Sequence, residues 1–189
     1  YLSPISFGRP DPIVEFAEKL KRTGDTDDWK AGKKMEPKLR TFAPVIVRGE
    51  ESEGVKFWGS PVTPWFGGDF WVFNKQRGHD IKQVWDKIPM DTHVVITHGP
   101  VMYKCDYIPQ QQFFAGCEDL ERKVQEVKPI LHLSGHIHEG YSWAYNGSTE
   151  FFNGSVLDAN YEMKNDPWEI ELNVHYKEVK VLNNILTPN

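Results

Sequence analysis

Three of the seven histidines follow short apolar runs and have the residue type and spacing of metal ligands. His98 lies in Thr-His-Gly-Pro at residues 97–100, and His136 and His138 lie in Gly-His-Ile-His-Glu-Gly at residues 135–140. Residues two apart in an extended segment point to the same side, and imidazole is a common ligand of Zn, Mn and Fe. The pattern predicts either one three-histidine site or two metals about 3.5–4 Å apart, a spacing suited to phosphoester hydrolysis.

The other four histidines are interpreted without a chemical role. His132 lies inside an apolar run and is expected to be buried and structural. His93 and His175 are expected at strand positions, and His79 is expected at an exposed helix start.

The elements that would position the three candidate ligands form a strand, helix and strand. Residues 92–97 and 130–133 are short, apolar and bounded by Pro or Gly, which is typical of buried parallel strands. Between them, residues 117–127 show helical periodicity. Neighbouring parallel strands lie about 4.8 Å apart, and ligands bind beyond their carboxyl ends. The sequence therefore predicts that the three histidines meet at one edge of a sheet.

The remaining elements are predicted from periodicity, capping residues and turn residues. Helices are expected from Asp11-Pro12 to residues 23–24 and over residues 79–88. Residues 24–38 are expected to form an exposed loop, with or without a helical turn within it. Strands are expected at 42–47 and 55–59 as one hairpin, at 141–145 and 149–153 around Asn146-Gly147, and at 168–174 and 176–182. Asn146 and Asn153 each begin an Asn-x-Ser sequence, and both are interpreted as turn residues.

Composition narrows the class of protein. The chain has 189 residues and a formal net charge of −5. The length fits one domain, and the acidic balance argues against strong binding to duplex nucleic acid. No apolar run approaches the length of a membrane span. The two cysteines do not form a disulfide framework, which favours reduced thiols and a cytoplasmic location.

Several sequence blocks carry a family resemblance. Residues 97–100 and 135–138 resemble the last two signature blocks of the calcineurin-like metallophosphoesterases. Gly-Ser-Pro-Val-Thr-Pro-Trp-Phe at 59–66, the blocks at 73–78 and 135–141, and Asn-Gly-Ser at 153–155 resemble one branch more closely. That branch is the metallophosphoesterase-domain (MPPED) proteins, related to class III cyclic nucleotide phosphodiesterases.

The resemblance implies a fold and a reaction. The expected fold is α/β, the C-terminal half of a metallophosphoesterase-type β-sandwich flanked by helices, with residues 1–189 forming the C-terminal part of a single domain. The expected reaction is phosphodiester hydrolysis on a nucleotide-type substrate, in which a hydroxide bridging two divalent cations attacks phosphorus. The cations would be Mn, Fe or Zn, with Mn favoured.

The resemblance also assigns roles to individual residues. His98 and His136 would bind the second metal and His138 the first. Asn74, Arg77 and Gly99 would lie at the substrate.

The chain departs from the family pattern in its first half. The family's Asp-x-His and Gly-Asn-His blocks have no match in this chain. Gly24-Asp25 and Gly68-Asp69 are Gly-Asp pairs, but neither follows a predicted buried strand, so the Gly-Asp block has no match either. Two divalent cations held by imidazoles alone would lack charge compensation. We therefore expect an N-terminal half of the same domain, as a separate chain or a missing segment, to supply the carboxylates. The alternative is a catalytically inactive binding or structural subunit that keeps the fold.

Overall fold

The computed structural model describes residues 12–35, 54–68 and 72–182. The chain divides into two compact units, residues 1–42 and 43–189, which are described separately. The expectation that residues 1–189 form part of a single domain stays a prediction beside this division. Among the described residues, no helix has the length and apolar character needed to cross a membrane.

The first unit contains a pair of helices, α1 (Pro12–Lys21) and α2 (Thr26–Met35). The prediction of α1 is confirmed, whereas the prediction of an exposed loop over residues 24–38 is wrong. Asp25 starts α2, because its Oδ1 accepts hydrogen bonds from the N–H groups of Asp27 and Asp28 at 2.8 and 2.9 Å. The helices approach closely at Gly32, where a Cβ would lie 2.6 Å from the carbonyl oxygen of Ala17.

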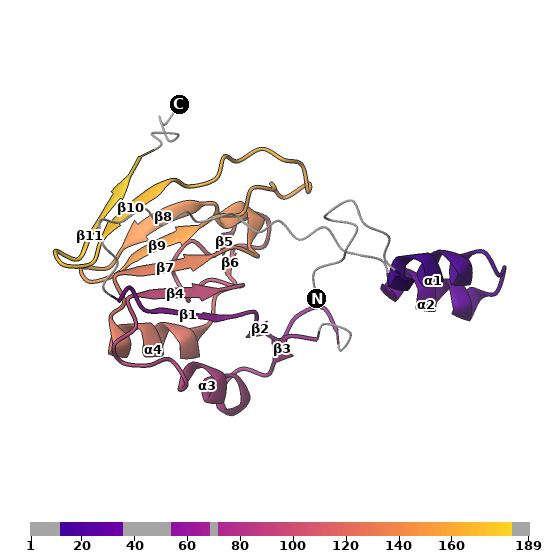
Figure 1. Ribbon diagram of the computed structural model, residues 1–189, viewed down its shortest axis with the longest axis horizontal. Helices are drawn as coiled ribbons and strands as arrows, with labels where there is room; N and C mark the ends of the chain where they lie inside the picture. Colours follow the sequence, from indigo (N-terminus) through magenta and orange to yellow (C-terminus); the bar gives the residue numbers. More distant parts are fainter. Residues whose placement is uncertain (1–11, 36–53, 69–71, 183–189) are drawn as a thin grey trace. The chain divides into compact units, whose positions relative to one another are not determined.

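The second unit is built on a five-stranded sheet with the order β1-β4-β7-β9-β8 (Figure 1). Its strands are β1 (Phe57–Ser60), β4 (Val94–Thr97), β7 (Leu131–Ser134), β8 (Ser142–Tyr145) and β9 (Glu150–Asn153). The first four in the order are parallel, and β8 pairs antiparallel with β9 through the predicted hairpin. The α/β class and the strand–helix–strand unit are therefore confirmed.

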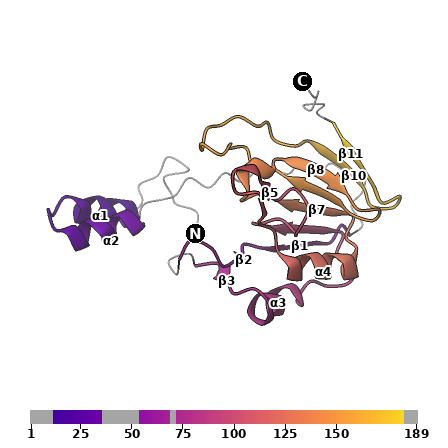
Figure 2. The same cartoon turned by 180° about the vertical axis from the view of Figure 1, so that it is seen from behind.

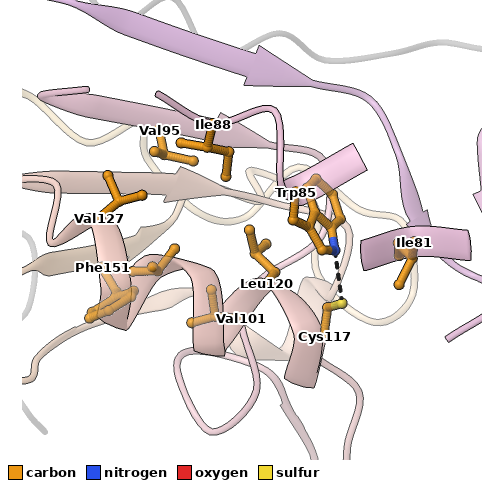
Figure 3. Packing of buried hydrophobic residues seen from close by; sticks show 10 residues of the cluster. Ile81, Trp85, Ile88, Val95, Val101, Cys117, Leu120, Val127 and Phe151 are labelled. Carbon is orange, nitrogen blue, oxygen red and sulfur yellow. Dashed lines mark hydrogen bonds between the residues drawn. The ribbon is translucent and has the colours of Figure 1, made fainter. Parts of the chain in front are cut away.

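Both faces of this sheet are covered. Helices α3 (His79–Trp85) and α4 (Glu118–Val127) pack with Val95 and Phe151 on one face. In this core the Nε1–H of Trp85 donates to Sγ of Cys117 at 3.3 Å (Figure 3). The ribbon of β10 (Ile170–Asn173) and β11 (Glu178–Val181) packs on the other face, against Val94 and Phe152. Figure 2 shows these two layers from behind.

Two pairs of short strands were not predicted. Strand β2 (Thr63–Pro64) pairs parallel with β3 (Asn74–Lys75), and β5 (Tyr107–Ile108) pairs antiparallel with β6 (Phe113–Phe114). Two one-turn 3-10 helices also lie among the described residues of the second unit. Helix η2 (Pro109–Gln111) lies between β5 and β6, and η3 (His138–Gly140) follows β7.

Only the second strand of the hairpin predicted from residues 42–47 and 55–59 lies in the described part of the chain. Residues 42–47 lie outside the described residues. Strand β1 is present, but the partner that the structure shows for it is β4, in parallel register from Phe57 opposite Val94. Local turn residues predicted a hairpin, whereas pairing with a distant strand gives β1 its place in the sheet.

Candidate metal centre

The structure brings His98 and His136 together at the carboxyl ends of β4 and β7. Their ring centroids lie 4.8 Å apart with the planes tilted by 47°. The pairing of the two parallel strands produces this approach, and a hydrogen bond from the N–H of Gly135 to the carbonyl oxygen of His98, at 3.0 Å, extends it beyond the strands. The two imidazoles can therefore act on one bound group.

His136 occupies a constrained position. Its backbone φ of 67° lies in the left-handed region, which costs free energy for a residue other than glycine. The ring of Phe66 packs against its imidazole with centroids 4.6 Å apart. Burial, and to a lesser extent the nearby His98 and His138, lower the pKa of His136 to about 4. The ring is therefore neutral at pH 7, the protonation state that metal binding requires.

His138 begins η3, and its tautomer follows from its hydrogen bond. Its Nδ1 lies 2.9 Å from the carbonyl oxygen of Asp158. Because a carbonyl only accepts, Nδ1 carries the proton, and the lone pair of the neutral ring is on Nε2. Metal-binding histidines commonly have this arrangement. The neighbouring acidic residue, Glu139, is exposed.

Asn153 connects the loop of the histidines to the loop after β4. It is fully buried at the end of β9, and its Nδ2 donates to the carbonyl oxygens of Ile137 at 2.7 Å and Cys105 at 3.0 Å. Its Oδ1 accepts from the N–H of Ser155 at 3.0 Å. Asn153 does make a local turn bond, as interpreted from sequence, but its contacts to two distant loops were missed.

Gly99 and Asn74, which the resemblance assigns to the substrate, lie close to the histidine pair. A Cβ on buried Gly99 would lie 3.7 Å from Cδ2 of His136 and 3.5 Å from Cγ2 of Thr63. The Nδ2 of Asn74 donates to the carbonyl oxygen of Phe66 at 2.7 Å, and its Oδ1 accepts from Thr63 Oγ1 at 3.0 Å. In this structure, the Asn74 side chain holds the segment that places Phe66 on His136.

Arg77 is used in holding the segment before α4. Its guanidinium donates to the carbonyl oxygens of Gly116 at 2.8 Å and Ala115 at 3.2 Å, and it pairs with the carboxylate of Glu118. These contacts give Arg77 a structural role, and its assignment to the substrate stays a prediction.

The residues present fit the imidazole part of a metal centre. The neutral state of His136 and the Nδ1 hydrogen bond of His138 match what such ligands need. Within residues 12–35, 54–68 and 72–182, however, no three His, Cys, Asp or Glu side chains come together as a group that could hold a metal ion. The described residues therefore provide part of a site.

The sequence of this chain is similar to those of known proteins. No family profile matches the chain. The human metallophosphoesterase domain-containing protein 1 is 42% identical over 120 residues, which are 63% of this chain and 36% of that protein. The mouse protein of the same name matches equally. This region of the chain is metallophosphoesterase-like.

A more distant relative extends the comparison. A UPF0046 protein of Caenorhabditis elegans is 33% identical over 132 residues, which are 69% of this chain and 33% of that protein. The resemblance inferred from the sequence blocks is thus confirmed. The match spans about a third of the length of these curated relatives.

Proposed function

We propose that this chain provides the histidine ligands of a dinuclear, metal-dependent phosphoesterase that hydrolyses nucleotide-type phosphodiesters. The observation that carries the proposal is the pair of imidazoles of His98 and His136, 4.8 Å apart at the ends of neighbouring parallel strands. His138 would contribute a third imidazole from η3, with its Nε2 lone pair directed by the bond to Asp158. The names of the relatives support the phosphoesterase class.

The chain's own residues would hold and orient these ligands. Burial keeps His136 unprotonated at neutral pH, and Phe66 fixes its ring by packing. When bound, two divalent cations, Mn being favoured, would supply positive charge to the phosphate and a nucleophile at neutral pH. The loops after β4 and β7 would thus hold the histidine side chains in place before the cations bind.

We also propose that the N-terminal half of the same domain completes the site, and the edge of the sheet supports this. Strand β1 stands at the end of the strand order, and among the described strands its outer edge is unpaired. Nearby, Phe57 and Ile96 are 48% and 39% exposed. An open edge with exposed apolar side chains favours pairing with further chain. The carboxylates that offset the charge of two cations would come with that complement.

A second candidate is a catalytically inactive binding or structural subunit. The observation that favours it is that the described residues bring together no group of three metal-binding side chains. The two candidates differ in whether the histidines bind metal at all.

Metal binding can be tested on the 189-residue chain itself. The chain is labelled at histidine and titrated with Mn²⁺, and broadening of the histidine NMR signals is measured. We expect selective broadening of His98 and His136, and loss of that effect in His136→Gln. The matched control is His175→Gln, an exposed histidine between β10 and β11. Equal broadening of exposed and paired histidines would contradict the proposed centre.

Catalysis is tested on the chain combined with the expected N-terminal complement, joined to it or supplied as a separate chain. Hydrolysis of bis(p-nitrophenyl) phosphate is measured with Mn²⁺ and after chelation. Activity that depends on metal and on His136 supports the phosphoesterase. Metal binding without hydrolysis by the combined protein would favour the inactive subunit.

A further inference from the structure

Three aromatic rings gather on one face of the β5–β6 hairpin and the turn before it. Tyr103, Tyr107 and Phe114 are 66%, 40% and 40% exposed. Tyr107 and Phe114 are directly paired across the strands, with ring centroids 4.9 Å apart, and Phe114 also meets Tyr103 at 5.1 Å. We call these three residues the aromatic platform. Exposed rings that contact one another present apolar surface to whatever binds there.

The segment that carries the platform is fixed in place. Asp106 is 1% exposed, and its Oδ2 accepts from the N–H groups of Tyr103 at 3.0 Å and Gly116 at 2.9 Å. Tyr103, Cys105 and Gln112 all have left-handed φ values. Non-glycine residues in this conformation cost free energy, and such residues gather at functional sites. The segment therefore holds an unfavourable backbone while presenting exposed rings.

The same segment lies against the loop of the candidate metal centre. The Nδ2 of Asn153 bridges the carbonyl oxygens of Cys105 and Ile137, one residue before His138. The backbones meet so closely that a Cβ on Gly140 would lie 2.1 Å from the carbonyl oxygen of Cys105. Beyond His138, the ring of Tyr161, which is 76% exposed, contacts its imidazole with centroids 4.8 Å apart. One exposed aromatic ring, that of Tyr161, thus contacts the histidine loop directly, and the backbone that carries the platform meets this loop at Cys105.

We propose that the aromatic platform receives the planar aromatic group of the substrate, a nucleobase or an aryl group, while the phosphate lies at the histidines. The inference rests on the proposed phosphoesterase function. Bases stack on aromatic side chains because every base has a π-face, and aromatic pairs prefer offset or edge contacts such as those within the platform. The segment that carries the platform meets the histidine loop at Cys105, and this backbone contact is the reason to assign the platform to the substrate.

The hairpin also contains a matched control. Phe113 is 50% exposed and adjoins Phe114 in β6. Successive residues of a strand point to opposite faces, so Phe113 lies on the face away from the platform. Replacing either phenylalanine by leucine removes a ring of similar exposure from the same strand.

The test uses probes that separate the base from the phosphate. Saturation-transfer NMR measures binding of adenosine, which has no phosphate, and of ribose 5-phosphate, which has no base, to the 189-residue chain. We expect adenosine to bind, with its dissociation constant raised about tenfold by Phe114→Leu or Tyr103→Leu. Phe113→Leu should leave adenosine binding unchanged. None of these variants should alter the response to ribose 5-phosphate.

The outcomes distinguish the platform from the metal centre. Adenosine binding that follows Phe114 and not Phe113 supports the platform even where no hydrolysis is found. Absence of adenosine binding, or equal loss in both variants, overturns it, whatever the histidines do with Mn²⁺. Concentration-dependent self-association lost in Phe114→Leu, without adenosine binding, would assign the rings to a second copy of the chain and also overturn it.

Discussion

Acid should destabilise the fold through one buried histidine, His132 in β7. Its side chain is among those less than 2% exposed, and its Nε2 lies 2.9 Å from Oγ1 of Thr97. That hydroxyl donates its own proton to the carbonyl oxygen of Gly99 at 2.6 Å, so the neutral ring donates to Thr97. Burial lowers the pKa of His132 from 6.5 to about 3.

The magnitude follows from this difference in pKa. Below pH 6.5 the unfolded chain takes up a proton that the folded chain refuses until about pH 3, so the free energy of unfolding falls as the pH falls. One pKa unit corresponds to about 1.4 kcal/mol. Between pH 7 and pH 5 this group should therefore remove about 2 kcal/mol of stability.

The assay compares urea unfolding at pH 7 and pH 5 for the natural chain and for His132→Gln. Glutamine can still donate a hydrogen bond but does not titrate, so the variant should lose about 2 kcal/mol less between the two pH values. His79→Gln, at an exposed histidine, controls for a histidine-to-glutamine replacement outside the core. An equal pH-dependent loss in His132→Gln and the natural chain would refute the reasoning.

Three further substitutions test the contacts around the site. Asn153→Ala removes three hydrogen bonds of a buried side chain and should lower the free energy of unfolding by about 2–4 kcal/mol, measured by urea unfolding against Asn160→Ala as an exposed control. Gly140→Ala should prevent folding or lower the melting temperature sharply, because its Cβ would overlap a carbonyl oxygen, whereas Gly59→Ala meets its first neighbour at 3.4 Å and should be mild; equal melting temperatures would contradict this. Arg77→Ala should speed amide hydrogen exchange over residues 113–118, since three partners of the guanidinium lie there; unchanged exchange would contradict the structural role.

The strands and helices that place the histidines could be predicted because their patterns are local. The apolar runs of β4 and β7 and the periodicity of α4 are visible in the sequence. Parallel pairing then puts His98 and His136 at one edge without further information. The burial of His132 follows from its place inside an apolar run, and the structure confirms it.

The contacts that shape the site could not be predicted, because they join residues far apart in the chain. Nothing near His138 in sequence indicates that the carbonyl group of Asp158 would set its tautomer. Every residue has a backbone carbonyl oxygen, so the type of residue at position 158 does not reveal that its carbonyl group would bind His138. Likewise, Asn153 reads locally as a turn residue, and its bond to Cys105 depends on the packing of two loops. For α2 a signal was present, since Asp25 before a charged run is a typical N-cap.

The strand pairing also has a consequence for the order in which the sheet assembles. In this five-stranded sheet, β8 and β9 are joined by a tight turn at Asn146-Gly147, and such hairpins form in about 1–10 μs. Every parallel pairing requires closure of a much longer stretch of chain, which is slower. Assembly should therefore begin at the hairpin and continue with β7, which pairs with β9 across a shorter stretch of chain than separates β4 from β7 or β1 from β4. The hairpin follows β1, β4 and β7 in the chain, so these three strands are synthesised before the pair at which we expect the sheet to start.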